Sequence, residues 1–61
     1  MREFAVCFMD EREPIAITKF LADAITWIDS YAGDDKDDLV ICEMVSGTVV
    51  RVMDIDGSYI A

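Results

Sequence analysis

Histidine is absent from this 61-residue sequence, and the absence removes the side chain that most often serves as a general base in enzymes. Ser30, Ser46 and Ser58 have no evident base partner, and the last two stand beside glycine, where serine is common in turns. We therefore expect no enzymatic activity, no catalytic residue and no cofactor.

Cysteine is also scarce. Cys7 and Cys42 are the only two, and each lies inside an apolar run. Without histidine or a Cys-x-x-Cys pair, a zinc site is not expected. Thiols inside apolar strands, with no secretion signal before them, indicate buried, reduced cysteines in a cytoplasmic protein.

A complete calcium loop is missing too. Asp54-Ile55-Asp56-Gly57 resembles the opening of such a loop, D-x-D-x-D-G, but it lacks the third acidic position and the closing glutamate. No metal site is therefore expected. A small-ligand or calcium-binding module is a distant alternative.

Positive charge is sparse. Five lysines and arginines stand against thirteen aspartates and glutamates, which leaves a net charge of −8. This balance repels nucleic acid and anionic membranes, so neither is expected as a partner. It favours a basic protein partner, or it serves solubility alone. The candidate partner-binding residues are Asp10, Glu11, Glu13, Asp29, Asp34, Asp35, Asp37 and Asp38.

If these carboxylates gather on one surface, they could imitate the phosphates of nucleic acid. Small acidic inhibitors of nucleic-acid-binding enzymes work on this principle, and a basic groove attracts them at long range. The order of the elements does not require the first turn to lie beside the loop after the helix. Whether the acidic segments form one surface is therefore open at this stage.

Long hydrophobic runs are missing as well. Phe4–Met9 is continuous for six residues, which is too short for a signal peptide or a membrane span. A chain of 61 residues makes one small domain, residues 1–61. It buries only about 60% of its unfolded surface, so its core is marginal.

One stretch, Thr18–Gly33, has a helical period. Thr18 is expected to cap its first turn, and Gly33 to end it in a left-handed conformation. Trp27 and Tyr31 are interpreted as core rather than as an exposed aromatic shelf. The expected apolar face is Leu21, Ala24, Ile25, Ile28 and Ala32, widened by Phe20, Trp27 and Tyr31.

Four strands are predicted around the helix, namely Phe4–Met9, Ile15–Ile17, Leu39–Val45 and Thr48–Met53. Asp56-Gly57 predicts a type I′ turn, after which Tyr59-Ile60 either forms a short fifth strand or frays. The expected fold is α+β, with a single helix packed on an antiparallel sheet in the order β-β-α-β-β.

A two-residue turn at Ser46-Gly47 sets the expected register of the last hairpin, with Glu43 opposite Val50 and Cys42 opposite Arg51. Each face then carries one charge in its middle. A one-residue shift would reverse every assignment. The expected faces are Leu39, Ile41, Val45, Val50 and Val52 on one side, and Val40, Cys42, Met44, Val49 and Met53 on the other.

One helix covers only one face of such a sheet, and a face in contact with water should alternate apolar and polar residues. These strands do not alternate, so the second face would expose an apolar patch of a few hundred Å². We expect a homodimer that buries the helix-free face or joins edge strands. The candidate self-association residues are Ala5, Cys7, Met9, Val40, Cys42 and Met44.

The resulting interpretation is a small acidic cytoplasmic protein-interaction module, an adaptor or inhibitor of a basic partner. The alternative is a structural homo-oligomer. The layout is similar to that of many short bacterial and phage proteins, but no motif indicates a family, and a shared layout does not carry function.

Overall fold

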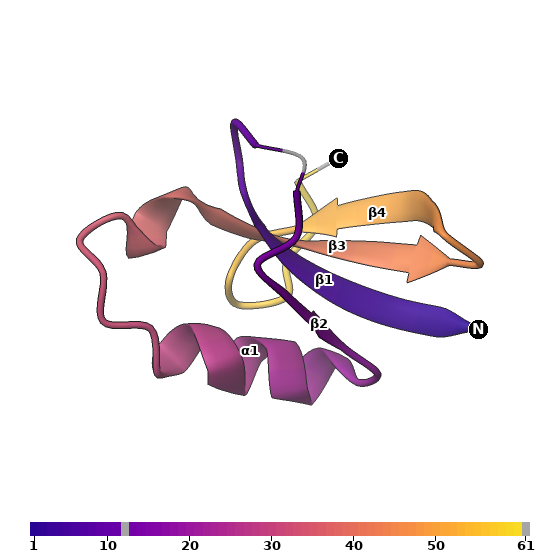
Figure 1. The fold of residues 1–61 in the computed structure, drawn as a ribbon, viewed down its shortest axis with the longest axis horizontal. Coiled ribbons are helices and arrows are strands. Elements are labelled where there is room, and N and C mark those ends of the chain that lie inside the picture. The colour runs from indigo at the N-terminus through magenta and orange to yellow at the C-terminus, as the bar shows by residue number, and fades with distance from the viewer. Residues whose placement is uncertain (12, 61) are drawn as a thin grey trace.

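The computed structural model describes residues 1–11 and 13–60 (Figure 1). Arg12, which the sequence places in the charged first turn, lies outside the described residues. The elements are β1 (Arg2–Phe8), β2 (Ala16–Thr18), α1 (Leu21–Asp29), the short 3₁₀ turn η1 (Lys36–Asp38), β3 (Leu39–Val45) and β4 (Thr48–Met53).

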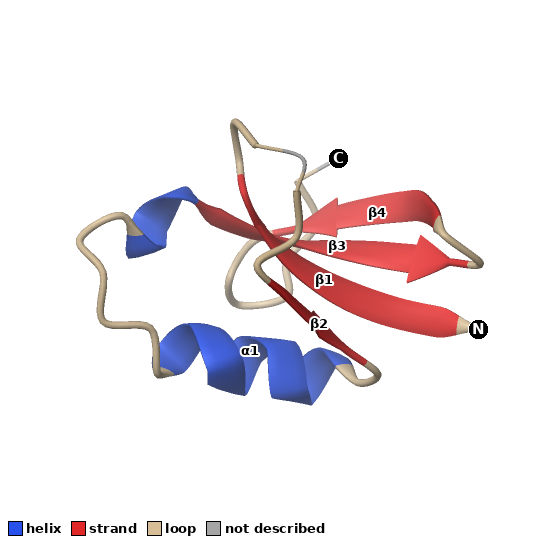
Figure 2. Cartoon of the chain, in the orientation of Figure 1, coloured by secondary structure: helices blue, strands red, loops and turns tan. Residues whose placement is uncertain are grey.

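The strands form a four-stranded sheet in the order β2-β1-β3-β4, and all neighbours are antiparallel. Helix α1 lies across one face of the sheet (Figure 2). The α+β fold and the order β-β-α-β-β are confirmed. Tyr59 forms only an isolated bridge with Met53, so the described residues contain no fifth strand.

The helix is shorter than Thr18–Gly33 at both ends. Thr18 pairs with Phe4 in the sheet, and its Oγ1 donates a hydrogen bond to the carbonyl oxygen of Phe20 at 2.9 Å. The cap position falls instead to Phe20, whose extended backbone precedes the first helical residue and whose ring cannot accept a capping hydrogen bond. The prediction that Thr18 caps the helix was therefore wrong, because Thr18 is the last residue of β2 and pairs with β1.

The far end of the helix differs for a packing reason. Helix α1 ends at Asp29, and Gly33 is not among the described glycines with positive φ. The Tyr31 side chain folds back over the loop, and a Cβ on Gly33 would lie only 2.6 Å from its Cε2 atom. Gly33 thus permits a close approach and does not form a left-handed helix end.

The main core lies between the sheet and α1. Trp27 and Tyr31 pack against it, as expected. Their rings stack at 5.8 Å, and Tyr31 also meets Phe8 edge-on at 6.3 Å. Phe20 and Ala32, by contrast, are exposed. The buried core residues are Val6, Ala24, Ile28, Leu39, Ile41 and Met53.

The last hairpin has the predicted two-residue turn, and both Ser46 and Gly47 have positive φ, as a type I′ turn requires. The register then shifts between Met44 and Glu43, which leaves Val50 as an extra residue in β4. The pairs Glu43 with Val50 and Cys42 with Arg51 were therefore wrong.

The bulge exchanges the faces of the three residues that follow it. Arg51 lies opposite Glu43, and Val52 lies opposite Cys42. Met53 accordingly enters the helix-side core, and Val52 packs on the other face. The expected assignment of Val52 and Met53 was reversed, because a bulge shifts side-chain alternation by one.

The turn after β4 also differs from the expected type I′ form. The Gly57 N–H donates to the Asp54 carbonyl at 2.9 Å, and the Asp54 N–H donates to the Ser58 carbonyl at 2.7 Å. Only Gly57 of this turn has positive φ. This is a three-residue loop with glycine in the left-handed position.

Candidate interaction surfaces

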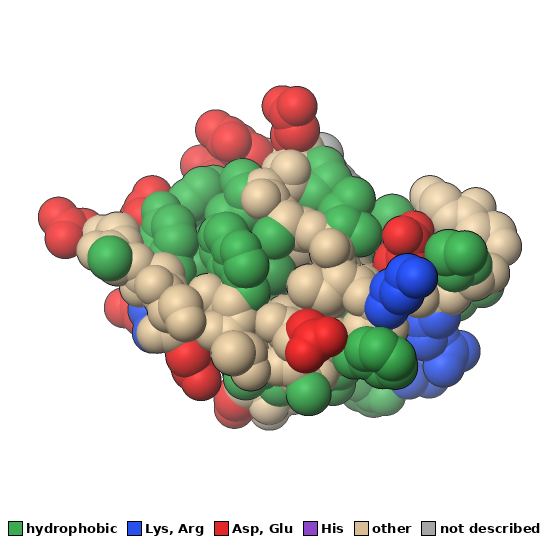
Figure 3. Space-filling model, turned by 60° about the horizontal axis from the view of Figure 1, so that its bottom comes forward, with side chains coloured by type: hydrophobic (Ala, Val, Ile, Leu, Met, Phe, Trp, Pro, Cys, Tyr) green, Lys and Arg blue, Asp and Glu red, His purple; other side chains and the backbone are tan. Residues whose placement is uncertain are grey.

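The pairing of β1 with β3 brings the first turn beside η1. Phe8 lies opposite Leu39, and just beyond them the Met9 N–H donates a hydrogen bond of 2.7 Å to the Asp38 carbonyl. Asp10 and Glu11 therefore lie next to Asp38, although the sequence alone left this open. Acidic side chains gather at this end of the molecule, on the left and upper edge of Figure 3. We call it the acidic end.

The acidic end comprises seven exposed acidic residues. They lie in the turn after β1 and in the segment between α1 and β3, and Glu13, Asp34 and Asp35 are among them. The Tyr31 hydroxyl donates to Asp35 at 2.8 Å, which holds that loop and raises the pKa of Tyr31. Asp29 is exposed at the end of α1, and no hydrogen bond among the described residues ties it to the others. The members are Asp10, Glu11, Glu13, Asp34, Asp35, Asp37 and Asp38.

An ion-pair cluster that sequence reasoning missed lies toward the opposite end of the sheet, on the helix side. The Glu43 side chain is only 8% exposed, and its carboxylate lies 3.0 Å from Arg2 Nε and 3.8 Å from Arg51 Nη1. Arg51 also donates to the Tyr59 hydroxyl at 2.5 Å and lies over that ring. The bulge brings Arg51 into this cluster, and no local pattern indicates a bulge at that position.

This cluster lines an open cleft of about 450 Å³ together with Leu21 and Gly57. Its two guanidinium groups share one buried carboxylate, which offsets one of their two positive charges within the protein. The arrangement stabilises Glu43 and positions Tyr59. We therefore assign it a structural role.

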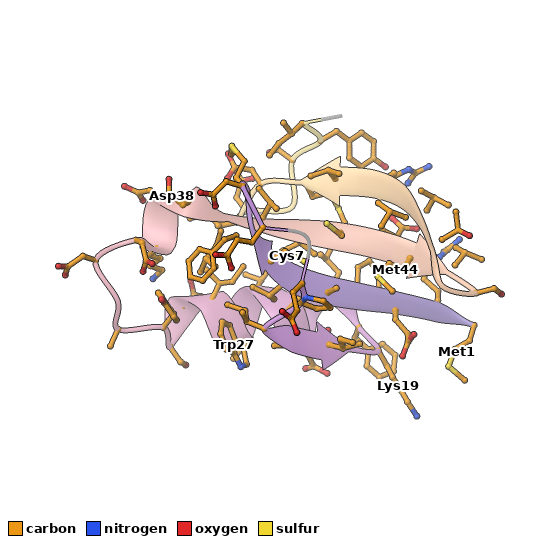
Figure 4. All side chains as sticks on the ribbon, turned by 45° about the horizontal axis from the view of Figure 1, so that its top comes forward. Met1, Cys7, Lys19, Trp27, Asp38 and Met44 are labelled. Carbon is orange, nitrogen blue, oxygen red and sulfur yellow. The ribbon has the colours of Figure 1, made fainter. Side chains whose placement is uncertain are left out.

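The six candidate self-association residues, Ala5, Cys7, Met9, Val40, Cys42 and Met44, all line one depression of about 230 Å³ on the helix-free face. Cys7 and Met44 mark it in Figure 4. Ala5, Cys7 and Val40 are already buried, whereas Met9 is exposed. Pro14 and Ile60 also line the depression, so the face is a shallow hollow with walls and not a bare plane.

The two thiols lie on this face, on neighbouring strands. Cys7 is buried, as expected, but Cys42 is half-buried. Burial raises the pKa of Cys7 to about 11, and the neighbouring Cys42 thiol adds to the shift. At neutral pH the Cys7 sulfur is therefore protonated and a poor nucleophile.

The carboxylates of Asp54 and Asp56 accept hydrogen bonds from backbone N–H groups of their own turn, the turn after β4. The Asp54 carboxylate accepts the Ile55 N–H at 2.8 Å. The Asp56 carboxylate accepts the Ser58 N–H at 2.9 Å, which lowers the pKa of Asp56. Among residues 1–11 and 13–60, no group of three histidine, cysteine, aspartate or glutamate side chains is placed to hold a metal ion.

No helix in the described part of the chain is long and apolar enough to cross a membrane. Comparison with protein-family models, with curated proteins and with solved structures finds no match for this chain. The fold and the surfaces define the class: a small α+β protein with an acidic end and an apolar depression on its helix-free face. The function is therefore argued from these two surfaces.

Proposed function

We propose that this protein is a small acidic interaction module, an adaptor or inhibitor that binds a basic protein through its acidic end. The observation that supports this proposal is the 2.7 Å hydrogen bond between the Met9 N–H and the Asp38 carbonyl. It joins two loops that are far apart in the sequence, so that their carboxylates act on a partner together.

Charge density is what makes such a surface useful. Exposed single charges contribute little to binding, but several on one surface sum to a field that steers an oppositely charged partner. A basic groove that binds nucleic-acid phosphates is the kind of surface such an array fits. The compartment we propose is the cytoplasm, because the chain carries two free thiols and no disulfide among its described residues.

A fluorescent poly-L-lysine peptide of about 20 residues is a suitable first probe, measured by anisotropy at about 50 mM salt, where screening is weak. The test variant is Asp10→Asn, Asp37→Asn and Asp38→Asn combined. The matched control, Asp23→Asn, Asp54→Asn and Asp56→Asn combined, removes the same net charge elsewhere. Asparagine keeps an oxygen that can accept the turn hydrogen bonds of Asp54 and Asp56.

We expect the test variant to bind about tenfold more weakly and the control less than about twofold, because three exposed ion pairs contribute about 0.5 kcal/mol each. Equal weakening by both variants would mean that only net charge matters and would refute a localised surface. A further measurement tests whether duplex DNA displaces this protein from a basic DNA-binding protein. Displacement would indicate that the acidic end imitates phosphates, and its absence would indicate simple charge attraction.

A second candidate function, the homo-oligomer, is favoured by a different observation. Exposed apolar side chains surround the depression on the helix-free face, among them Met9, Val49 and Ile60. Such a surface normally binds a partner.

A further inference from the structure

We propose that two copies of this protein dock through their helix-free faces in antiparallel orientation, so that the Lys19 end of each copy lies against the acidic end of the other. The proposal rests on the homo-oligomer candidate, and in this dimer the acidic end, which we propose for a basic partner, faces the second copy. It specifies the face and the orientation, both of which the sequence left open.

The face is apolar because of the bulge at Val50. Without it, Arg51 would lie opposite Cys42, in the middle of the face. With it, Val52 takes that place and Arg51 pairs with Glu43 on the helix side. Among the described residues, the middle of the helix-free face then consists of Ala5, Cys7, Val40, Cys42, Met44 and Val52.

Exposed apolar groups extend the face to its margins. Ile17 lies opposite Ala5, and Val49 lies opposite Met44, so both point to the helix-free side. They are 53% and 49% exposed. These side chains would become buried only against another protein surface.

The size of the face fits a second copy of this chain. The molecule measures 31 × 21 × 20 Å, so the outline of one broad face is at most roughly 600 Å², below the 800 Å² per partner of a standard interface. Two such faces would bury at most roughly 1,200 Å² in total, which is at the small end of specific interfaces. We therefore expect a dimer that dissociates in the micromolar range.

Charge selects the orientation. Figure 4 shows Asp38 at one end of the sheet and Met44 toward the other end, with Lys19 below Met44 at the margin of the molecule. A two-fold axis across the strands brings each Lys19 end to the partner's acidic end. An axis along the strands would instead bring the two acidic ends together, which like-charge repulsion opposes. The antiparallel arrangement therefore offsets part of the repulsion between two subunits of charge −8.

The sheet edges are less suitable for pairing. Strand β2 has only three residues, and Pro14 precedes it. Strand β4 carries the bulge, and the Ile60 N–H already bonds to the Val52 carbonyl at 2.9 Å. Short strands, proline and bulges protect an edge from further pairing.

Adjacent valines provide a matched test of the face. Val49 and Val50 are 49% and 51% exposed, yet only Val49 lines the depression. Sedimentation equilibrium from about 1 to 300 μM should show a monomer–dimer equilibrium for the natural chain. We expect Val49→Lys to weaken the dimer at least about tenfold, since each interface then contains two added charges, and Val50→Lys less than about twofold.

Ile17→Lys is a second variant on the same face, should Val49→Lys disturb the hairpin. Circular dichroism verifies the fold of each variant. A natural chain that stays monomeric at about 300 μM would refute the dimer, as would equal weakening by Val49→Lys and Val50→Lys.

Two lysines test the orientation. Lys19→Glu and Lys36→Glu change the net charge equally, but Lys36 belongs to η1 at the acidic end. In the antiparallel dimer Lys19→Glu turns two attractive contacts into repulsive ones, and we expect about tenfold weaker association, with a smaller effect of Lys36→Glu. The reverse ranking would refute the antiparallel orientation.

Poly-L-lysine binding by the Val49→Lys variant separates this proposal from the proposed function. Val49 lies away from the acidic end, so the variant should lose dimerisation and keep the localised binding. A natural chain that dimerises as expected but shows no localised binding of poly-L-lysine would support this proposal and refute the proposed function.

Discussion

The two faces of the sheet are built from different kinds of side chain. The helix side buries large groups such as Val6, Leu39 and Ile41 against Ile28 of α1. The helix-free side has Ala5, Cys7 and Val40 at its centre, and these are also buried although no helix covers them. Small side chains between neighbouring strands are shielded by the strands and by the loops at the margin. A face can thus be dry at its centre while its rim still exposes apolar surface.

The charged residues differ between the faces as well. Glu43 and Arg51 both lie on the helix side, where they pair, and the bulge at Val50 is what places them together. Had the ladder been regular, Arg51 would have lain on the helix-free face, and Glu43 would have paired with Arg2 alone. A single extra residue therefore removes an unfavourable charge from one face and gives the buried carboxylate on the other a second cation.

The largest expected difference between the faces is tested by neighbouring residues of β3. Ile41→Ala removes a fully buried side chain from the helix-side core and should lower the free energy of unfolding by about 2–5 kcal/mol. Cys42→Ala removes one half-buried sulfur from the other face and should cost less than about 1.5 kcal/mol. Urea denaturation followed by circular dichroism measures both.

A domain this small has a stability of about 5 kcal/mol, so Ile41→Ala can leave it partly unfolded. Ile41→Val, with an expected cost of about 0.5–1.5 kcal/mol, keeps the comparison measurable. Equal costs at Ile41 and Cys42 would show that both faces are packed alike.

An intermediate effect is expected from the ion pair on the helix side. Arg2→Gln leaves the buried Glu43 carboxylate with Arg51 at 3.8 Å as its remaining cation, and should cost about 1–3 kcal/mol. Arg2→Gln combined with Glu43→Gln should cost less than Arg2→Gln alone, because a neutral amide needs no cation. Lys19→Gln, an exposed charge, is the control and, at about 1 μM protein where little dimer forms, should cost less than about 0.5 kcal/mol. If the double variant is no more stable than Arg2→Gln, the carboxylate does not depend on Arg2.

The smallest expected difference is in the labelling rates of the two thiols on the helix-free face, and it involves no change in stability. Only the thiolate reacts with iodoacetamide, and the pKa of Cys7 is raised to about 11, so its labelling should be very slow at pH 8 and rise about tenfold per pH unit toward pH 11. Cys42, which is half-buried, should react first. Peptide mapping by mass spectrometry distinguishes the two sites, and labelling of the unfolded chain in urea sets the reference rate. Native Cys7 reacting at that reference rate would contradict its burial.

Local patterns in the sequence predicted the parts of the fold that depend on near neighbours. The apolar runs around Ser46-Gly47 predicted β3 and β4 with the bounds the structure shows, because a two-residue turn with positive φ can be recognised from its residues. The helical period predicted α1 but placed both of its ends too far out. Its start depends on Thr18 joining the sheet, and its end on Tyr31 packing against Phe8. Both contacts join residues that are far apart in the sequence, and a helical period describes only residues a few positions apart.

Composition and periodicity by themselves determined the class of this protein: one helix on an antiparallel sheet, acidic, with apolar residues on both sides of its strands. The tertiary structure decided the rest. It placed the first turn beside η1, which joins the acidic loops, and it placed the bulge at Val50, which moves Arg51 to Glu43. The physical reason is the same in both cases. Strand register is set by packing and hydrogen bonding across the whole sheet, and a shift of one residue reverses every face beyond it.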